Sequence, residues 1–313
     1  MGQAIIAKIP VGATIAAAYH FAFTDFLKIL GAVWLPWTIT SAGSFFFLPR
    51  LIGIFAAIGK QDFAVALNQS WILVPWLLFG ILLYSVQIAA TIELALQSPR
   101  KQLWLRFSVG KPVWRLIGAA LLLLLVFLGA WIASILAGIV VGLILALLVT
   151  VAKAYMKIIL TVGLGLVAAL VYAGILFVTV RLAFLLPPVV IAEERISLRR
   201  AASLGRGNFW RLLGIFLAIF LPFWLLQRIL LYALVPHGML LAAPAGASAA
   251  EKAAVLANVM TWVNRLLGEI IDYWYFVYPL SLIWSVLYLG LIFGAQTFAY
   301  RAATAGLPPV TDN

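Results

Sequence analysis

Residues 116–152 read LIGAALLLLLVFLGAWIASILAGIVVGLILALLVTVA, a run of 37 residues without a charged side chain. As one helix the run would be about 55 Å long, whereas the hydrocarbon core of a bilayer is about 30 Å thick. We therefore expect this stretch to lie in a membrane and to bend, to tilt out of it or to lie partly in the interface. The expected break is near Gly138 and Gly142.

The whole chain has the composition of a membrane protein. Of its 313 residues 66% are hydrophobic and 10% are charged, and the mean hydropathy is +1.16. Soluble proteins carry roughly 25% charged residues, because a globule needs a polar surface. This composition excludes a soluble enzyme, a disordered protein and a disulfide scaffold. Since the chain has no cysteine, cysteine-based zinc sites, iron–sulfur clusters and thiol nucleophiles are excluded as well.

Six apolar segments are long enough to span a bilayer, which takes about 20 residues of helix. They comprise residues 28–48, 71–93, 115–136, 161–185, 211–234 and 272–298. The sequence therefore predicts an all-α integral membrane protein with six transmembrane helices, in which residues 1–313 form a single membrane domain.

The connecting segments predict how the chain is oriented. If the N-terminus is inside, the inner segments hold thirteen Lys and Arg residues and the outer segments hold six, while Arg181 and Arg228 lie within spans. An excess of cations in short cytoplasmic loops is the usual arrangement. We therefore expect a multi-pass protein whose N- and C-termini are both cytoplasmic.

Three of the spans open alike, with DFLKILG from Asp25, PVWRLIG from Pro112 and NFWRLLG from Asn208. Two closing spans match as well, with GILLYSVQIA from Gly80 and GILFVTVRLA from Gly174. Any span can start with aromatic residues and a cation, but this does not explain the paired endings. We therefore expect three tandem two-helix repeats, at approximately residues 11–98, 99–190 and 191–303, followed by a tail at 304–313.

Basic segments open the second and third repeats. They carry six cations that we expect to contact lipid headgroups: Arg100, Lys101, Arg106, Arg195, Arg199 and Arg206. The last three would form one cationic stripe if their segment is helical. Such segments suit amphipathic helices that lie in the interface, although a solvated loop would carry the same charges. Anionic membrane lipids are the expected partner, at about 1 kcal/mol per cation.

The outer connector of the third repeat has the pattern of an amphipathic helix. Ser248 and Glu251 have the spacing of a capping box at its start. Polar residues, among them Asn258 and Arg265, share one face, and apolar residues such as Trp262 share another. We expect this helix to lie in the outer interface of the membrane.

Polar residues inside the spans are candidates for a functional site, because burying them in lipid costs free energy. Gln87, Arg181 and Gln296 are predicted to line a polar cavity that opens to the cytoplasm. We expect ion pairs of Arg181 with Glu93 and of Arg228 with one of two carboxylates, Glu269 or Asp272. The alternative is that both arginines extend to the interface or form simple pairs without a functional role.

The chain offers few groups for catalysis. The two histidines, His20 and His237, fall on opposite sides of the membrane in this topology, and no hydrolase, phosphate-binding or metal motif is present. We therefore predict that the protein is not an enzyme, with no cofactor, no metal and no nucleic acid partner.

Small residues indicate close helix packing in two places. They are a ladder from Ala130 to Thr150 and the pair Gly290 and Gly294. The packing partner is a second subunit or, as we favour, another helix of the same chain.

The stretch RLAFLLPPVVIAEERISLRRAASLGRGNFWRLLGIFL at residues 181–217 resembles a bacterial family. It is similar to the glycerophosphoryl diester phosphodiesterase membrane-domain family, in a span that ends in Arg, a proline pair, an acidic-to-basic loop and Asn-Phe-Trp-Arg opening the next span. The resemblance covers about 40 residues and implies a multi-span domain in the bacterial inner (cytoplasmic) membrane. It supplies no catalytic residue.

Two functions are compatible with these features. The first is a non-catalytic inner-membrane protein that binds or organises lipid or a membrane protein partner, or forms a homo-oligomer. The alternative is a transporter or channel for a small or lipid-like solute, with its site between the repeats.

Overall fold

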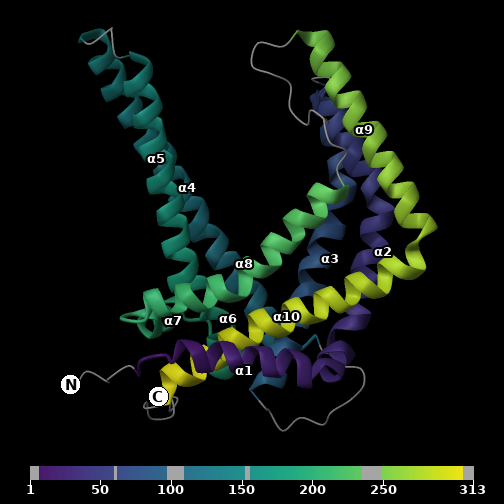
Figure 1. Ribbon diagram of the computed structural model, residues 1–313, viewed down its shortest axis with the longest axis vertical. Coiled ribbons are helices and arrows are strands. Elements are labelled where there is room, and N and C mark those ends of the chain that lie inside the picture. The colour runs from purple at the N-terminus through teal and green to yellow at the C-terminus, as the bar shows by residue number, and fades with distance from the viewer. Residues whose placement is uncertain (1–6, 60–61, 97–108, 152–155, 235–247, 306–313) are drawn as a thin grey trace. The chain divides into compact units, whose positions relative to one another are not determined.

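The computed structural model describes residues 7–59, 62–96, 109–151, 156–234 and 248–305 (Figure 1). Within these ranges the chain forms helices and no strand. The prediction of an all-α protein is therefore confirmed.

Among the described residues, six segments are long and apolar enough to cross a membrane, as the sequence predicts. They are Phe26–Phe47, Phe63–Ala95, Lys111–Ile144, Val171–Ala192, Phe209–Ile229 and Trp274–Thr304. The helices are α1 (Val11–Thr24), α2 (Phe26–Gly59), α3 (Phe63–Ala95), α4 (Lys111–Val151), α5 (Met156–Val178), η2 (Thr179–Ala183), α6 (Leu186–Ala192), α7 (Leu198–Gly205), α8 (Phe209–Leu234), α9 (Ala249–Asp272) and α10 (Trp274–Thr304). This is the architecture of a multi-pass membrane protein.

The chain forms two compact units. Unit 1 comprises Met1–Thr14, Gly110–Phe216 and Gln296–Asn313, and unit 2 comprises Ile15–Val109 and Leu217–Ala295. Helices α1, α8 and α10 each contribute one end to unit 1 and the rest to unit 2. The boundaries of the units therefore differ from those of the predicted repeats.

Unit 1 is built on a hairpin of α4 and α5, which lie side by side (Figure 1). At the base of the hairpin α6 packs against α4, and α7 packs against η2. Leu186, Val189 and Leu204 are at most 1% exposed there. The buried core of this unit thus lies at the base of the hairpin, where α6 and α7 meet it.

Helix α4 runs through Gly138 and Gly142 without interruption, so the predicted break is wrong. Its 41 residues extend for about 60 Å. A break would leave peptide groups without hydrogen-bond partners, and in lipid no water is present to replace the helical bonds. Glycine alone therefore does not end a helix in this surrounding.

Unit 2 is built on a second hairpin, in which α2 packs along α3 and α9 contacts α2 (Figure 1). Gly43 of α2 lies against the ring of Trp76 of α3, and this ring stacks on Phe47 at 5.4 Å between centroids. Gly290 and Gly294 of α10 lie against α1, close to Ala22 and Phe21. This glycine pair therefore serves packing within one chain, which is the reading that we favour from the sequence.

Helix α9 begins with the capping box that the sequence predicts. The Ser248 amide donates to Glu251 Oε2 at 2.6 Å, and the Glu251 amide donates to Ser248 Oγ at 3.3 Å. Asn258 and Arg265 are exposed, whereas Val259 and Trp262 are half-buried. The predicted amphipathic helix is thus present; its place in the outer interface stays a prediction.

We expect acidification to loosen the first turn of α9. Hydrogen bonds from Ser248 hold the pKa of Glu251 below its ordinary value of 4.5. The stabilisation is therefore complete above that ordinary value and is lost as the pH falls through the lowered folded-state pKa. Hydrogen exchange at the Ser248 amide, compared between wild type and Glu251→Ala, measures the effect. At neutral pH the Ser248 amide should exchange more slowly in wild type than in the variant, and this difference should vanish in acid. A difference that persists in acid would contradict the assignment.

Candidate functional site

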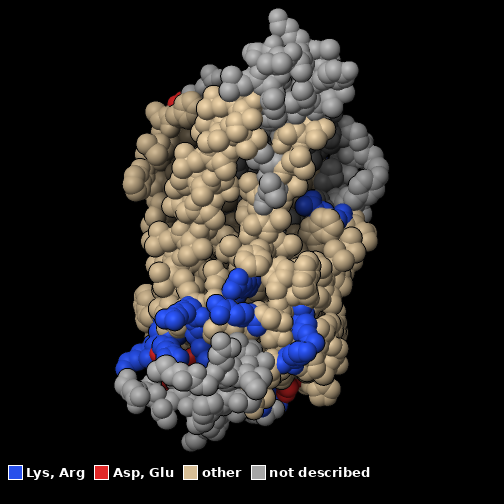
Figure 2. Space-filling view, turned by 90° about the vertical axis from the view of Figure 1, so that its left-hand side faces the viewer, with Lys and Arg blue, Asp and Glu red and all other residues tan. Residues whose placement is uncertain are grey.

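Unit 1 concentrates positive charge at the ends of its helices. Its described residues include eleven cations and two carboxylates, and one of the cations is Lys157 in the first turn of α5. The other ten cations, which we call the basic end, are Lys8, Lys111, Arg115, Arg181, Arg195, Arg199, Arg200, Arg206, Arg211 and Arg301. Figure 2 shows most Lys and Arg side chains of the drawn face gathered near its lower end, with a smaller group apart from them. The hairpin of α4 and α5 extends away from this group of cations. It is largely apolar, since residues 116–151 of α4 carry no charge.

Glu193 organises the centre of the basic end. Its side chain is 3% exposed, and it accepts hydrogen bonds from Arg195 at 3.0 Å and from Arg200 at 2.9 Å. The Tyr300 hydroxyl of α10 donates to the same carboxylate at 3.3 Å. A buried carboxylate needs such partners, because an unpaired charge in a low-dielectric interior is costly. Glu193 therefore fixes the segment between α6 and α7 against α10.

Sequence reasoning missed Glu193 and Arg200. The signal that could have found them is an acidic residue at the end of an apolar segment, directly before a group of arginines.

Glu194, the residue after Glu193, has different surroundings. It has a positive φ of 52° and a side chain that is 75% exposed. Glu194 accepts a hydrogen bond from Arg115 of α4 at 3.0 Å. The turn thus directs two adjacent carboxylates to different partners.

The predicted stripe of Arg195, Arg199 and Arg206 on one helix is wrong. Ser197 caps α7 by accepting from the Arg200 amide at 3.2 Å, and Arg206 has an extended backbone after its last turn. The cap and the turn at Gly207, with φ of +78°, limit α7 to eight residues. Arg195 therefore precedes the helix and Arg206 follows it. Arg199 and Arg206 are exposed, and no ion pair joins them to a carboxylate of the described chain.

The segment before α1 is attached to the start of α8. The Ile9 amide donates to Asn208 Oδ1 at 3.1 Å, and Asn208 Nδ2 donates to the Ala7 carbonyl at 3.1 Å. Arg211 donates to the Ile9 carbonyl at 2.9 Å. Asn208 is 2% exposed, so its amide satisfies the backbone of this segment inside the unit. The exposed Lys8, between Ala7 and Ile9, is thereby held at the basic end.

Arg181 lies in the π-helical turn η2. The Phe184 amide donates to the Thr179 carbonyl at 3.0 Å, five residues back, and the Arg181 guanidinium lies 5.3 Å from the ring centroid of Phe177. Turns of this kind are frequent at functional sites, and no pattern in the sequence predicts this one. A side chain on Gly205 of α7 would come within 3.1 Å of the Arg181 carbonyl. Gly205 therefore lets α7 approach the turn.

The other predicted site residues have varied surroundings. Gln296 is 8% exposed, and its Oε1 has no hydrogen-bond partner in the described part of the chain. Glu93 is half-buried and Asp272 is exposed. Gln87 belongs to unit 2, while Arg181 and Gln296 belong to unit 1. That the three line one polar cavity, and that Arg181 pairs with Glu93, stay predictions. Arg100, Lys101, Arg106 and His237 lie outside the described residues.

Glu269 pairs with Arg265, whereas the sequence suggested a pair of Arg228 with Glu269 or Asp272. Arg265 Nε lies 3.0 Å from Glu269 Oε1, and residues four apart on one helix face each other. Arg228 instead lies over the ring of Trp224, 5.3 Å from its centroid.

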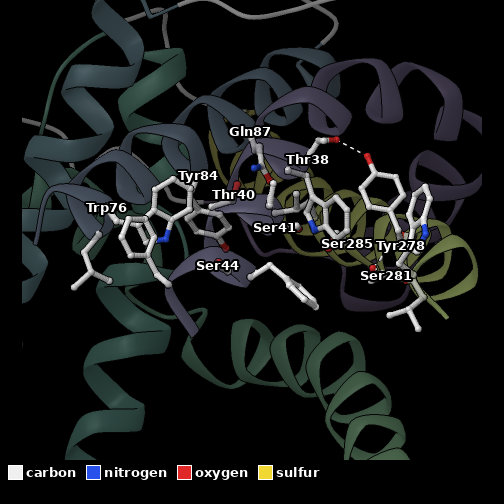
Figure 3. A pocket seen from close by; sticks show the side chains of 18 of the residues that line it. Thr38, Thr40, Ser41, Ser44, Trp76, Tyr84, Gln87, Tyr278, Ser281 and Ser285 are labelled. Atoms are coloured by element: carbon white, nitrogen blue, oxygen red, sulfur yellow. Dashed lines mark hydrogen bonds between the residues drawn. The ribbon is translucent and has the colours of Figure 1, made fainter. Parts of the chain in front are cut away.

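Unit 2 holds a cavity of about 890 Å³ between α2, α3 and α10 (Figure 3). Aromatic side chains line it, among them Trp37, Trp76 and Tyr278. Gln87 also lines it and is 4% exposed. The sequence indicated the polar position but not the cavity, because its walls come from segments more than 200 residues apart.

The chain matches no protein-family model, no curated protein and no solved structure. Residues 181–217 fold as the end of the fourth apolar segment, α6, α7 and the start of α8. Their resemblance to the glycerophosphoryl diester phosphodiesterase membrane-domain family stays a prediction.

Proposed function

We propose that this chain is a non-catalytic protein of the bacterial inner membrane that binds or organises anionic lipid at the basic end of unit 1. The observation that carries the proposal is the ratio of eleven cations to two carboxylates among the described residues of this unit, because ten of these cations belong to the basic end. Cations beside an apolar span lie where the acidic headgroups of the bilayer are.

The cations of the basic end differ in whether a carboxylate forms an ion pair with them. Glu193 holds Arg195 and Arg200, and Glu194 holds Arg115. Arg199 and Arg206 are exposed and form no ion pair with a carboxylate of the described chain. A headgroup phosphate at these two arginines would gain charge-assisted hydrogen bonds without breaking the pairs of Glu193.

The same charges support a cytoplasmic orientation of both termini. The basic end combines the segment before α1, the starts of α4 and α8, and Arg301 in the last turn of α10. Cations at one set of helix ends are typical of the cytoplasmic side. The proposal therefore places the basic end at the inner leaflet.

Three tandem repeats with interfacial amphipathic segments remain part of the proposal. The matched openings lie at Phe26 of α2, at Val113 in the first turn of α4 and at Phe209 of α8. Each opening thus coincides with the start of a long apolar helix, as a repeated unit requires.

We expect the double variant Arg199→Gln/Arg206→Gln to retain roughly 30-fold less anionic lipid, since each cation contributes about 1 kcal/mol. Native mass spectrometry of the full chain, extracted with phosphatidylglycerol and phosphatidylcholine, measures the bound lipid. Arg265→Gln is the control, because it removes an arginine of α9 that is 79% exposed.

Equal retention in both variants would overturn the proposal. A substrate-dependent flux through proteoliposomes that Arg181→Leu abolishes would instead favour the transport alternative.

A further inference from the structure

The cavity of unit 2 has the size and the walls of a ligand site. Its volume is about 890 Å³, and small-molecule pockets of about 300–1,000 Å³ are typically apolar with a few polar groups. Trp37 of α2, Trp76 of α3 and Tyr278 of α10 supply broad apolar faces (Figure 3). Three helices thus line one space.

Several polar side chains of the wall are already satisfied. Thr38 donates to the Trp34 carbonyl and bonds to the Tyr278 hydroxyl, and Thr40 donates to the Pro36 carbonyl. Ser281 donates to the Val277 carbonyl at 2.7 Å. These hydroxyl groups leave little hydrogen-bonding capacity for a ligand.

The Gln87 amide is different. The residue is 4% exposed and lines the cavity, and its side chain makes no hydrogen bond to the residues that the structure describes. Ser41 and Ser285 also line the cavity without such a bond. A buried amide without a partner is costly, so a group that bonds to it gains free energy. Figure 3 shows the amide directed toward Ser41 and Thr40.

The charge of the wall excludes most headgroups. None of the described residues that line the cavity is charged, and an ionised group without a counter-charge is strongly disfavoured in an apolar surrounding. Phe45 and Leu77 belong to the same wall and are 38% and 61% exposed. The wall is therefore continuous with apolar surface on two membrane-spanning helices, from which a ligand dissolved in the bilayer can enter.

We propose that this cavity binds an uncharged membrane lipid that carries a hydroxyl or ester group, such as diacylglycerol. The polar group bonds to Gln87 and to Ser41 or Ser285, and an acyl chain lies along the aromatic wall. This site uses none of the residues of the basic end, so it stands or falls independently of anionic lipid binding there.

Photocrosslinking tests the proposal on the full chain in lipid nanodiscs. The probe is diacylglycerol with a diazirine in one acyl chain; parallel arms use a diazirine phosphatidylglycerol and a diazirine long-chain isoprenoid alcohol. We expect the uncharged probes to label α2, α3 and α10 around the cavity, and the anionic probe to leave them unlabelled. The more strongly labelling uncharged probe identifies which source of the hydroxyl group the site prefers.

Two variants separate binding from folding. Gln87→Leu keeps the volume and removes the amide, so half-maximal labelling should need about fivefold more diacylglycerol. Ser285→Leu places an apolar side chain in the cavity and should abolish labelling there. Gln69→Leu is the matched control, because Gln69 is another glutamine of α3 that does not line the cavity. Its Oε1 is buried and has no hydrogen-bond partner in the described part of the chain.

Labelling that Gln69→Leu lowers as much as Gln87→Leu would overturn the proposal. The same holds for equal labelling by the anionic probe, for crosslinks outside the cavity only, and for unchanged labelling of Ser285→Leu.

Discussion

Replacing Glu193 with glutamine should lower the free energy of unfolding by about 2 kcal/mol. The variant keeps the shape of the side chain but removes the charge that Arg195 and Arg200 share. Breaking a fully buried pair costs about 3–5 kcal/mol. The expected loss is smaller, because Arg195 and Arg200 are 48% and 23% exposed and can turn to water. Thermal unfolding of the purified protein in detergent measures the change.

The adjacent carboxylate is the control for this prediction. Glu194→Gln removes a pair with Arg115 in which Glu194 is 75% exposed, so it should cost less than about 1 kcal/mol. Comparable losses in the two variants would show that burial of Glu193 does not organise the basic end. Loss of Glu193 should also free Arg195 and Arg200, so the variant should retain no less anionic lipid than wild type at a temperature where it is folded.

Replacing Gly43 with alanine should destabilise the hairpin of α2 and α3 by about 1–3 kcal/mol, as overpacking does. A Cβ atom there would come within 1.9 Å of the Trp76 ring. The ring cannot move away freely, because it stacks on Phe47 with 5.4 Å between the ring centroids. Since Trp76 also lines the cavity, its displacement should weaken diacylglycerol labelling. Unfolding in detergent and photocrosslinking measure the two effects.

Gly80→Ala is the matched control on the same hairpin. The nearest atom to its added Cβ is Thr40 Cγ2 at 3.9 Å, an ordinary van der Waals contact. Alanine is the better helix former, so this variant should be neutral or up to about 1 kcal/mol more stable. If Gly43→Ala behaves like Gly80→Ala, the close approach of α2 and α3 at Trp76 is not a constraint on the fold.

The sequence alone determined the features that depend on neighbouring residues. Hydropathy over about 20 residues identified the six spans, because each must satisfy its backbone within itself. The capping box of Ser248 and Glu251 joins groups three residues apart, so its pattern is visible along the chain. The pair of Gly290 and Gly294 signalled a close helix approach, although not that α1 is the partner.

Only the tertiary structure decided how distant residues combine. Glu193 accepts a hydrogen bond from Tyr300, which lies 107 residues away in the sequence. Asn208 accepts a hydrogen bond from the Ile9 amide, which lies 199 residues away. The cavity at Gln87 needs α2 and α10 to meet α3. Hydropathy treats each segment separately, whereas these contacts depend on which polar groups remain unsatisfied once the helices pack. The unbroken path of α4 was decided in the same way, because lipid offers its peptide groups no partner except the helix itself.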